Sequence, residues 1–156
     1  MPSEPFDIDL EGDLNVLARV ADDLEDPRPL MRDIAEAIHS GVEGNVRRQE
    51  GPQGKPWTDL ATSTKNERRE AGYWPGQMLV RTGSMLSSVQ TFHSDTTAGV
   101  STNKPQAALL HFGGEEDMPP GPADVPARPW LYISTSTLEE IEDTALDYID
   151  DAADRA

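Results

Sequence analysis

The sequence contains no cysteine among its 156 residues. This absence excludes a disulfide scaffold, thiol catalysis and every metal site that is built on thiolates. Long apolar runs are also missing. None approaches the roughly 18 residues that a membrane-spanning helix needs, and the acidic start of the chain has the wrong charge for a cleaved signal. We therefore expect a soluble protein with no membrane partner.

Large apolar residues are scarce as well. Leu, Ile, Val and Phe together number 30, and the formal net charge is −16 at pH 7. Both values approach those of chains that stay disordered. A chain of this length nevertheless has the size of one domain and can bury about 70% of its unfolded surface. We expect a folded domain with a thin core.

The charge is unevenly distributed along the chain. Residues 1–26 hold nine acids and one base, and residues 139–154 hold eight acids and no base, whereas residues 44–81 hold seven bases and four acids. The overall acidity disfavours free binding to nucleic acids. We expect residues 1–26 to form an acidic N-terminal segment with a short helix, and residues 27–156 to form a single domain.

The order of the predicted elements is helices, then strands, then a helix, which is typical of an α+β fold. We expect a small antiparallel hairpin packed by a long N-terminal helix and a C-terminal helix. The predicted elements are a long helix over residues 27–46, short helices over 65–71 and from 82, strands over 89–94 and 98–102, a helix over 105–112, a strand over 130–133 and a last helix over 136–152. Side-chain caps are expected at Asp26, Thr64, Thr82 and Ser136.

Residues 113–129 are rich in proline and glycine and predict a long loop. Prolines on both sides of Arg128 fix the backbone there, so the end of this loop is stiff and extended. It should deliver Trp130 and Leu131 into the core and hold Arg128 for a paired or interface role.

Several fragments resemble sites of chemistry but fail at diagnostic positions. The acids from Asp7 begin like a calcium loop, yet Ala18 stands where a bidentate Glu is needed. Residues 51–55 have the wrong glycine spacing for a phosphate loop. His111 has no second histidine at ligand spacing, and serine nucleophile motifs are absent. We expect no enzyme activity, no metal and no cofactor.

Bases and aromatic residues cluster in the middle of the chain. Such a cluster could follow a nucleic-acid backbone or meet an acidic face of a neighbouring copy. The acidity of the whole chain favours the second interpretation. The cluster comprises Arg47, Arg48, Lys55, Lys65, Arg68 and Arg69, with Trp57, Tyr73 and Trp74 nearby.

Five segments in order resemble motifs of the phage virion morphogenesis (tail completion) family of Mu-like phages, and the match runs from about residue 30 to residue 149. The segments are residues 54–60, 64–65, 78–89, 112–114 and 125–131. Their core motif residues are Trp57, Leu60, Leu79, Leu86, Trp130 and Leu131. The chain departs from the family pattern with Gln106 in place of Tyr, His111 one position late, and Trp130 in place of Phe.

The resemblance implies a structural virion protein, not an enzyme, that acts in tail completion and head–tail joining as part of a neck or tail-terminus ring. A ring requires a heterologous interface, in which two different patches meet head to tail. The implied partners are other copies in a ring, with six as the expected number, other phage tail and neck proteins, and packaged DNA in passing. The expected location is the virion tail or neck, and the host cytoplasm during assembly.

Candidate interface residues follow from the charge pattern and the motifs. The hypothesis is that bases of one subunit face the acidic C-terminal helix of the next. The candidates are Lys65, Arg68, Arg69, Arg81, Arg128, Phe112, Gly113, Gly114, Glu139, Glu140 and Asp143. The alternatives are a DNA-contacting neck channel protein, a tail terminator and a non-viral soluble binding module.

Overall fold

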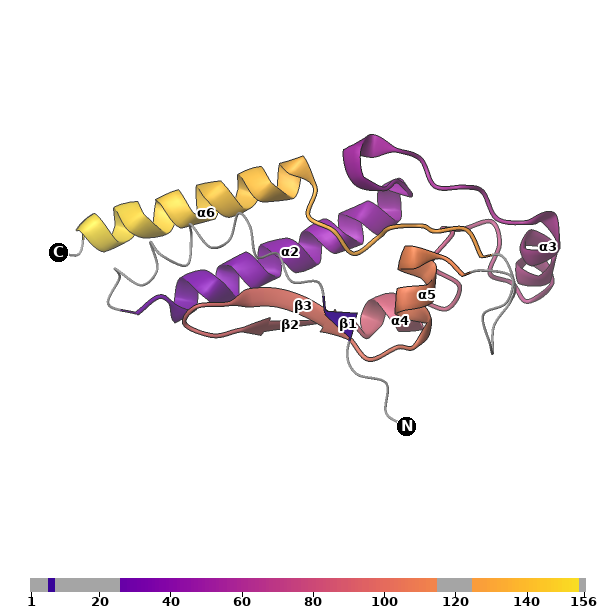
Figure 1. Cartoon of the computed structure of the whole chain (residues 1–156), viewed down its shortest axis with the longest axis horizontal. Helices are drawn as coiled ribbons and strands as arrows, with labels where there is room; N and C mark the ends of the chain where they lie inside the picture. The colour runs from indigo at the N-terminus through magenta and orange to yellow at the C-terminus, as the bar shows by residue number, and fades with distance from the viewer. Residues whose placement is uncertain (1–5, 8–25, 115–124, 155–156) are drawn as a thin grey trace.

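A computed structural model describes residues 6–7, 26–114 and 125–154 of the chain (Figure 1). The long helix α2 (Arg28–Arg48) lies in the middle, with the C-terminal helix α6 (Thr135–Asp154) along one side and a small sheet along the other. This arrangement confirms the predicted α+β fold. The short helix expected within residues 1–26 and the middle of the predicted proline-rich loop lie outside the described residues.

Helix α2 provides the apolar stripe on which the other layers pack. Its five apolar residues at four-residue spacing are at most 2% exposed, as the helical period requires. Pro27, not Asp26, is the N-cap residue, although an Asp26 side-chain oxygen accepts the backbone N–H of Arg28 at 3.3 Å. The stripe consists of Leu30, Ile34, Ile38, Val42 and Val46.

The sheet is antiparallel with strand order β1–β3–β2. The predicted hairpin is confirmed as β2 (Gln90–His93) and β3 (Ala98–Thr102). A short strand β1 (Phe6–Asp7), which the sequence did not predict, pairs with the other edge of β3. Phe92 lies opposite Gly99, where a Cβ atom would meet the Phe92 ring at 2.6 Å. Gly99 therefore makes room for that ring.

Helix α6 packs against α2 through a close approach near its first turn. Thr137 is 4% exposed, and a Cβ atom on Gly41 of α2 would lie 2.2 Å from its hydroxyl oxygen. Glycine at that position therefore allows the two helices to meet. The predicted cap at Ser136 is wrong: Ser134 accepts the backbone N–H of Thr137 at 3.2 Å, and the helix begins at Thr135.

Helix α3 (Thr62–Glu70) begins earlier than predicted. Ala61 is its N-cap residue and provides no side-chain hydrogen bond, so the capping box expected at Thr64 is wrong. The helix ends close to the predicted stop, since Gly72 has a positive φ of 85°. Figure 1 places α3 at one extreme of the molecule, beyond the C-terminal end of α2.

Two short helices and a 3-10 turn are the remaining elements of the described residues. They are η1 (Pro52–Gly54), α4 (Ser84–Ser87) and α5 (Gln106–Phe112). The N-cap of α4 is Gly83 with φ 84°, not Thr82, although the Thr82 hydroxyl accepts the Ser84 N–H at 3.3 Å. None of the helices within the described ranges has the length and apolar content to cross a bilayer.

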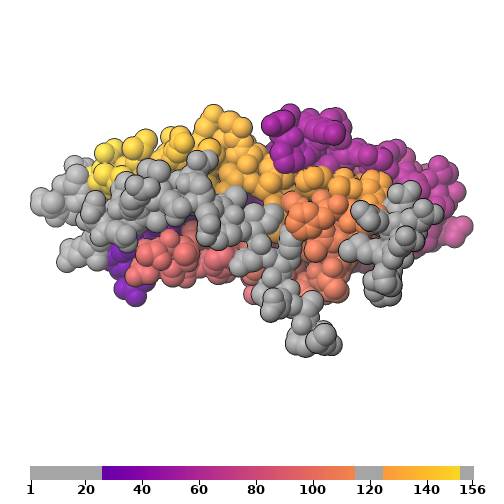
Figure 2. All heavy atoms as spheres, viewed as in Figure 1, coloured from indigo at the N-terminus to yellow at the C-terminus, as the bar shows by residue number. Residues whose placement is uncertain are grey.

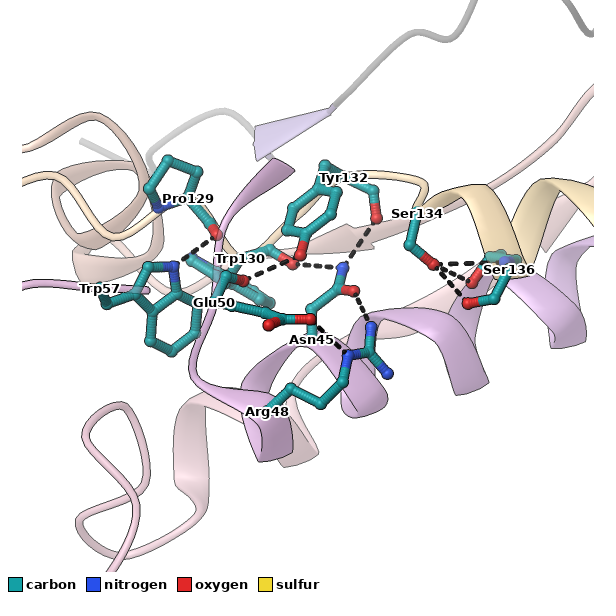
Figure 3. A network of polar contacts seen from close by, with 10 residues as sticks. Asn45, Arg48, Glu50, Trp57, Pro129, Trp130, Tyr132, Ser134 and Ser136 are labelled. Atoms are coloured by element: carbon teal, nitrogen blue, oxygen red, sulfur yellow. Dashed lines mark hydrogen bonds and ion pairs between the residues drawn. The ribbon is translucent and has the colours of Figure 1, made fainter. Parts of the chain in front are cut away.

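The strand predicted over residues 130–133 is wrong, because this segment pairs with a side chain (Figure 3). The amide nitrogen of Asn45 on α2 donates to the carbonyl oxygens of Trp130 at 3.1 Å and Tyr132 at 2.8 Å. The Asn45 side-chain oxygen accepts from Arg48 at 2.9 Å. Asn45 is 0% exposed. It replaces, inside the core, the partner strand that these carbonyl groups lack.

We predict that Asn45→Asp destabilises the protein by at least about 3 kcal/mol. The two side chains have nearly the same shape, but a carboxylate cannot donate to the two carbonyl groups and adds a buried charge. Urea unfolding at neutral pH measures the loss. The matched control is Asn103→Asp, an exposed site with the same charge change, which should shift stability by less than about 0.5 kcal/mol. Equal effects of the two variants would contradict the assigned role of Asn45.

Candidate functional site

Two sequence motifs that are about 70 residues apart bind each other directly. The indole N–H of Trp57 donates to the carbonyl of Pro129 at 2.9 Å (Figure 3). In the opposite direction, the Arg128 guanidinium donates to the carbonyls of Thr58 at 2.8 Å and Asp59 at 3.0 Å. The segment around Trp57 is therefore held against the proline-rich segment by reciprocal hydrogen bonds.

Arg128 serves its own chain in this structure. It is only 5% exposed, and its planar guanidinium reaches two carbonyls at once, which a lysine could not do in the same geometry. Burial, and after it the positive charge of Arg68, lowers the pKa of Arg128. Arg128 therefore differs from the other interface candidates: it joins the proline-rich segment to the segment around Trp57 and exposes little surface to a neighbouring copy.

The core motif residues lie in or next to the hydrophobic core. Trp57, Leu79, Trp130 and Leu131 are at most 6% exposed, and Leu60 and Leu86 are partly buried. The Trp130 indole N–H also donates to the carbonyl of Ala107 on α5 at 3.3 Å. This motif thereby joins α5 to the segment that Asn45 holds.

His111 on α5 has a structural position. Its Nδ1 atom lies 3.3 Å from the backbone nitrogens of both Trp130 and Leu131, which donate to it. That geometry requires the neutral ring, and burial lowers the pKa of His111 below its ordinary value. Phe112 follows, 67% exposed, with its ring edge-on to His111 at 4.7 Å.

Gly113 and Gly114 lie where the proline-rich loop begins and are placed against its far end. Gly113 has φ 79°, and a Cβ atom there would lie 2.8 Å from the Val125 carbonyl oxygen. The Gly114 N–H donates to that same carbonyl at 2.9 Å. The two glycines therefore join the ends of the loop, and its middle, residues 115–124, lies outside the described residues.

The remaining basic candidates gather on and beside α3, and we call them the basic end: Lys65, Arg68, Arg69 and Arg81. Lys65 pairs with Asp59 at 2.5 Å and lies 5.6 Å from the centre of the Trp74 ring. Its hydrogen bond is the main cause of the lowered pKa of Asp59. Arg81 pairs with Glu67 and lies 5.7 Å from the Tyr73 ring centre. These contacts orient the cations while leaving them accessible.

Two further basic candidates make local hydrogen bonds. Arg68 donates to the carbonyl of Gln77 at 3.1 Å, and Arg69 donates to the side chain of Asn66 at 3.0 Å. Arg69 is exposed, whereas Arg68 is partly buried. Arg69 can therefore be changed with less disturbance of the fold than Arg68.

The acidic candidates Glu139, Glu140 and Asp143 lie on the outward side of α6. Together with the exposed Glu142, Asp147 and Asp150 they form what we call the acidic face. The inward side carries Thr137, Ile141 and Ala145, which are at most 4% exposed. Helix α6 runs away from α3 towards the opposite extreme of an elongated molecule (Figures 1 and 2). Within one chain the structure therefore does not bring the acidic face to the basic end.

The described residues contain no group of three or more His, Cys, Asp or Glu side chains that could hold a metal ion. Two polar residues that the sequence pattern did not single out, Asn45 and Gln49, bind the segments that pack beside the C-terminal end of α2. Gln49 ends α2 with a positive φ of 55°, and its side-chain oxygen accepts the backbone N–H of Met78 at 2.7 Å. The one feature of the sequence that could have indicated a buried role for Asn45 is its position directly before Val46, the last residue of the apolar stripe of α2.

The chain is similar to known phage proteins over most of its length. The sequence profile of the phage virion morphogenesis family matches residues 8–150. The chain is 34% identical over 117 residues to protein G of Escherichia phage Mu, a protein named for capsid assembly. The matched stretch covers 74% of this chain and 75% of the phage Mu protein. It is 31% identical over 134 residues to the Mu-like prophage FluMu G protein 2 of Haemophilus influenzae, covering 83% and 86%. No solved structure matches the chain.

We predict that Arg128→Lys lowers the free energy of unfolding by about 2 kcal/mol although it keeps the charge. An ammonium group cannot donate to the carbonyls of Thr58 and Asp59 in the same planar geometry. Thermal or urea unfolding measures the loss. The control is Arg32→Lys at an exposed site, which should have little effect. A stability equal to that of the parent would show that the bidentate contact does not matter.

We also predict that His111 makes the protein less stable at mildly acidic pH. Because its folded-state pKa lies below its ordinary value of 6.5, the unfolded chain takes up the proton first. The stabilisation that the neutral His111 ring provides is therefore fully present above about pH 6.5, and it is lost as the pH falls through the folded-state pKa. The free energy of unfolding should differ less between pH 7.5 and about pH 5.5 in His111→Gln than in the parent. The control His93→Gln, at an exposed site, should behave like the parent. Identical pH profiles for the parent and His111→Gln would contradict this assignment.

Proposed function

The chain belongs to the phage virion morphogenesis family, and from this premise we propose that it acts in tail completion and head–tail joining as a subunit of a ring at the neck or tail terminus. The similarity to a phage Mu protein named for capsid assembly supports a position where the head is completed and joined to the tail. The virion is then its final location, and the host cytoplasm its location during assembly.

The observation that carries this proposal is the separation of opposite charges along the molecule. The basic end lies on and beside α3 at one extreme, and the acidic face lies on α6, which extends to the other (Figure 1). Two different patches that complement each other at opposite ends join copies head to tail. Such contacts close into a ring when the rotation between neighbouring copies is an exact fraction of a turn.

The local contacts of the basic end support its use as an interface. Lys65 and Arg81 are held over aromatic rings, so less side-chain entropy is lost when a partner carboxylate binds. Aromatic residues and arginine are also the residue types most enriched at interface centres. Tyr73, one of the supporting rings, is 42% exposed. The basic end therefore combines charge with apolar surface that a neighbour can cover.

A second candidate function is that the basic end contacts packaged DNA passing through a neck channel. Four cations beside two aromatic rings would suit a phosphate backbone. The net charge of −16 of the whole chain opposes binding to DNA. The two functions differ in their ligand: DNA binding would fall steeply with salt in the absence of any second copy.

We predict that Arg69→Glu and Glu140→Lys each weaken self-association at low salt by at least about fivefold, because each places like charges in a head-to-tail contact. Equimolar mixing of the two variants should restore part of the association, since one reversed patch then meets the other. Sedimentation velocity over a concentration series measures this, and electron microscopy tests for rings. Arg32→Glu is the matched control, because it makes the same charge change at an exposed site of α2 that belongs to neither patch.

Two results would contradict this proposal. One is a parent protein that remains monomeric at all concentrations and salt conditions tested. The other is an assembly that both charge reversals leave unchanged at low salt. Salt-sensitive binding of short duplex DNA by the monomer, lost in Arg69→Glu, would favour the second candidate function.

A further inference from the structure

A hollow of about 290 Å³ opens beside the basic end. Its floor is apolar and is formed by Met78, Leu79, Met85 and Leu110. The side chains of Leu79 and Met85 are at most 6% exposed, so this floor is the outer surface of the hydrophobic core. The volume is about ten times the roughly 30 Å³ that one water molecule occupies in the liquid. It is large enough to receive an apolar side chain.

Two arginines line the same hollow, Arg68 from α3 and Arg81 from the segment before α4. Burial, and after it the positive charge of Arg81, lowers the pKa of Arg68, as expected for two like charges that line one hollow. Each guanidinium has five N–H donors, and the hydrogen bonds to Gln77 and Glu67 leave donors available. The hollow is therefore apolar at its base and positively charged at its side.

The acidic face of α6 carries the complementary shape and charge. Leu146 projects from this helix and is 59% exposed. Helical spacing of three and four residues places Glu142, Asp143 and Asp150 around it, and all three are exposed. A single exposed leucine is ordinary. A leucine surrounded by three carboxylates matches an apolar hollow lined by two guanidinium groups.

We propose that Leu146 of one copy occupies this hollow in the next copy, with the carboxylates around it pairing with Arg68 and Arg81. This contact rests on the proposed function, and it names the residues through which neighbouring subunits of the ring meet. A chain cannot fill its own hollow, because α6 extends away from the α3 end of the molecule (Figure 1). The occupant is thus a second copy of this chain.

The contact follows the usual composition of an interface centre. An apolar anchor enters a pocket at the centre, and charged pairs surround it. Pairing with carboxylates would also relieve the repulsion between the two arginines. The apolar contact and the charges act together, so salt alone should weaken the contact without abolishing it.

The test uses two single variants of the full chain and their mixture. Leu146→Ser removes the apolar side chain and leaves the hollow intact. Ser84→Trp places a large ring at the hollow, which Ser84 lines, and leaves Leu146 intact. Ser87→Trp is the matched control, because Ser87 is exposed on the same helix α4 and does not line the hollow. Thermal unfolding of each variant checks that the monomer is folded.

We expect Leu146→Ser and Ser84→Trp each to weaken self-association at least tenfold in sedimentation or light scattering, and Ser87→Trp to associate like the parent. A mixture of the two weakened variants should form heterodimers that do not grow further, because it contains one intact Leu146 and one intact hollow per pair. If Ser84→Trp does not fold, Thr82→Trp, at another lining position, takes its place.

The possible failures are distinct. If the parent assembles and both variants assemble equally well, or if the weakened variants do not form heterodimers when mixed, the contact proposed here is wrong while the proposed ring stands. If the parent does not self-associate at all, the proposed function is wrong and this contact is wrong with it.

Discussion

The buried amide of Asn45 is the interaction on which the arrangement of this molecule depends. It lies on the central helix α2, and it binds two carbonyls of a segment 85 to 87 residues later in the chain. That segment contributes Trp130 and Leu131 to the core and leads directly into α6. In a low-dielectric interior, carbonyls without a donor would cost free energy. The position of the C-terminal helix on α2 therefore depends on a polar group within an apolar layer.

Hydrogen bonds between a side chain and a distant backbone carbonyl also hold together two motifs that lie far apart in the sequence. Arg128 and Trp57 each satisfy a polar group of the other's segment, so neither segment is complete without its partner. Tyr132 adds a hydroxyl hydrogen bond to the carbonyl of Glu50 at 2.8 Å on the same side. These side chains do in the core what a sheet ladder does elsewhere: they pair the backbone of irregular segments. A chain with few large apolar residues relies on such contacts to define its fold.

The apolar and β-prone patterns of the sequence were sufficient to predict the elements whose structure follows from local sequence. The stripe from Leu30 to Val46 predicted α2, and the β-prone runs around residues 95–97 predicted the hairpin. Errors occurred where a long-range contact decides the local structure. Residues 130–133 have the composition of a strand, yet their partner is the Asn45 side chain, which no local pattern shows. At the start of α6, Ser134 and not Ser136 accepts the Thr137 N–H, and the Thr137 side chain packs against Gly41 of α2, a contact that the local sequence does not show. The burial of Arg128 could not be predicted from local sequence either, because the two carbonyls that it binds lie about 70 residues earlier in the chain.

The fold also determines what the charges can do. A helix of 21 residues such as α2 spans about 30 Å, whereas charges on the surface are screened beyond about 8 Å at physiological salt. The basic end and the distant part of the acidic face therefore contribute almost nothing to each other's stability within one chain. In the ring proposed above they would interact between copies, where the two patches would be in contact with little water between them. Because the two patches differ and lie at opposite ends, each such contact would leave one patch of each kind free, so association would continue, closing into a ring or growing as an open filament.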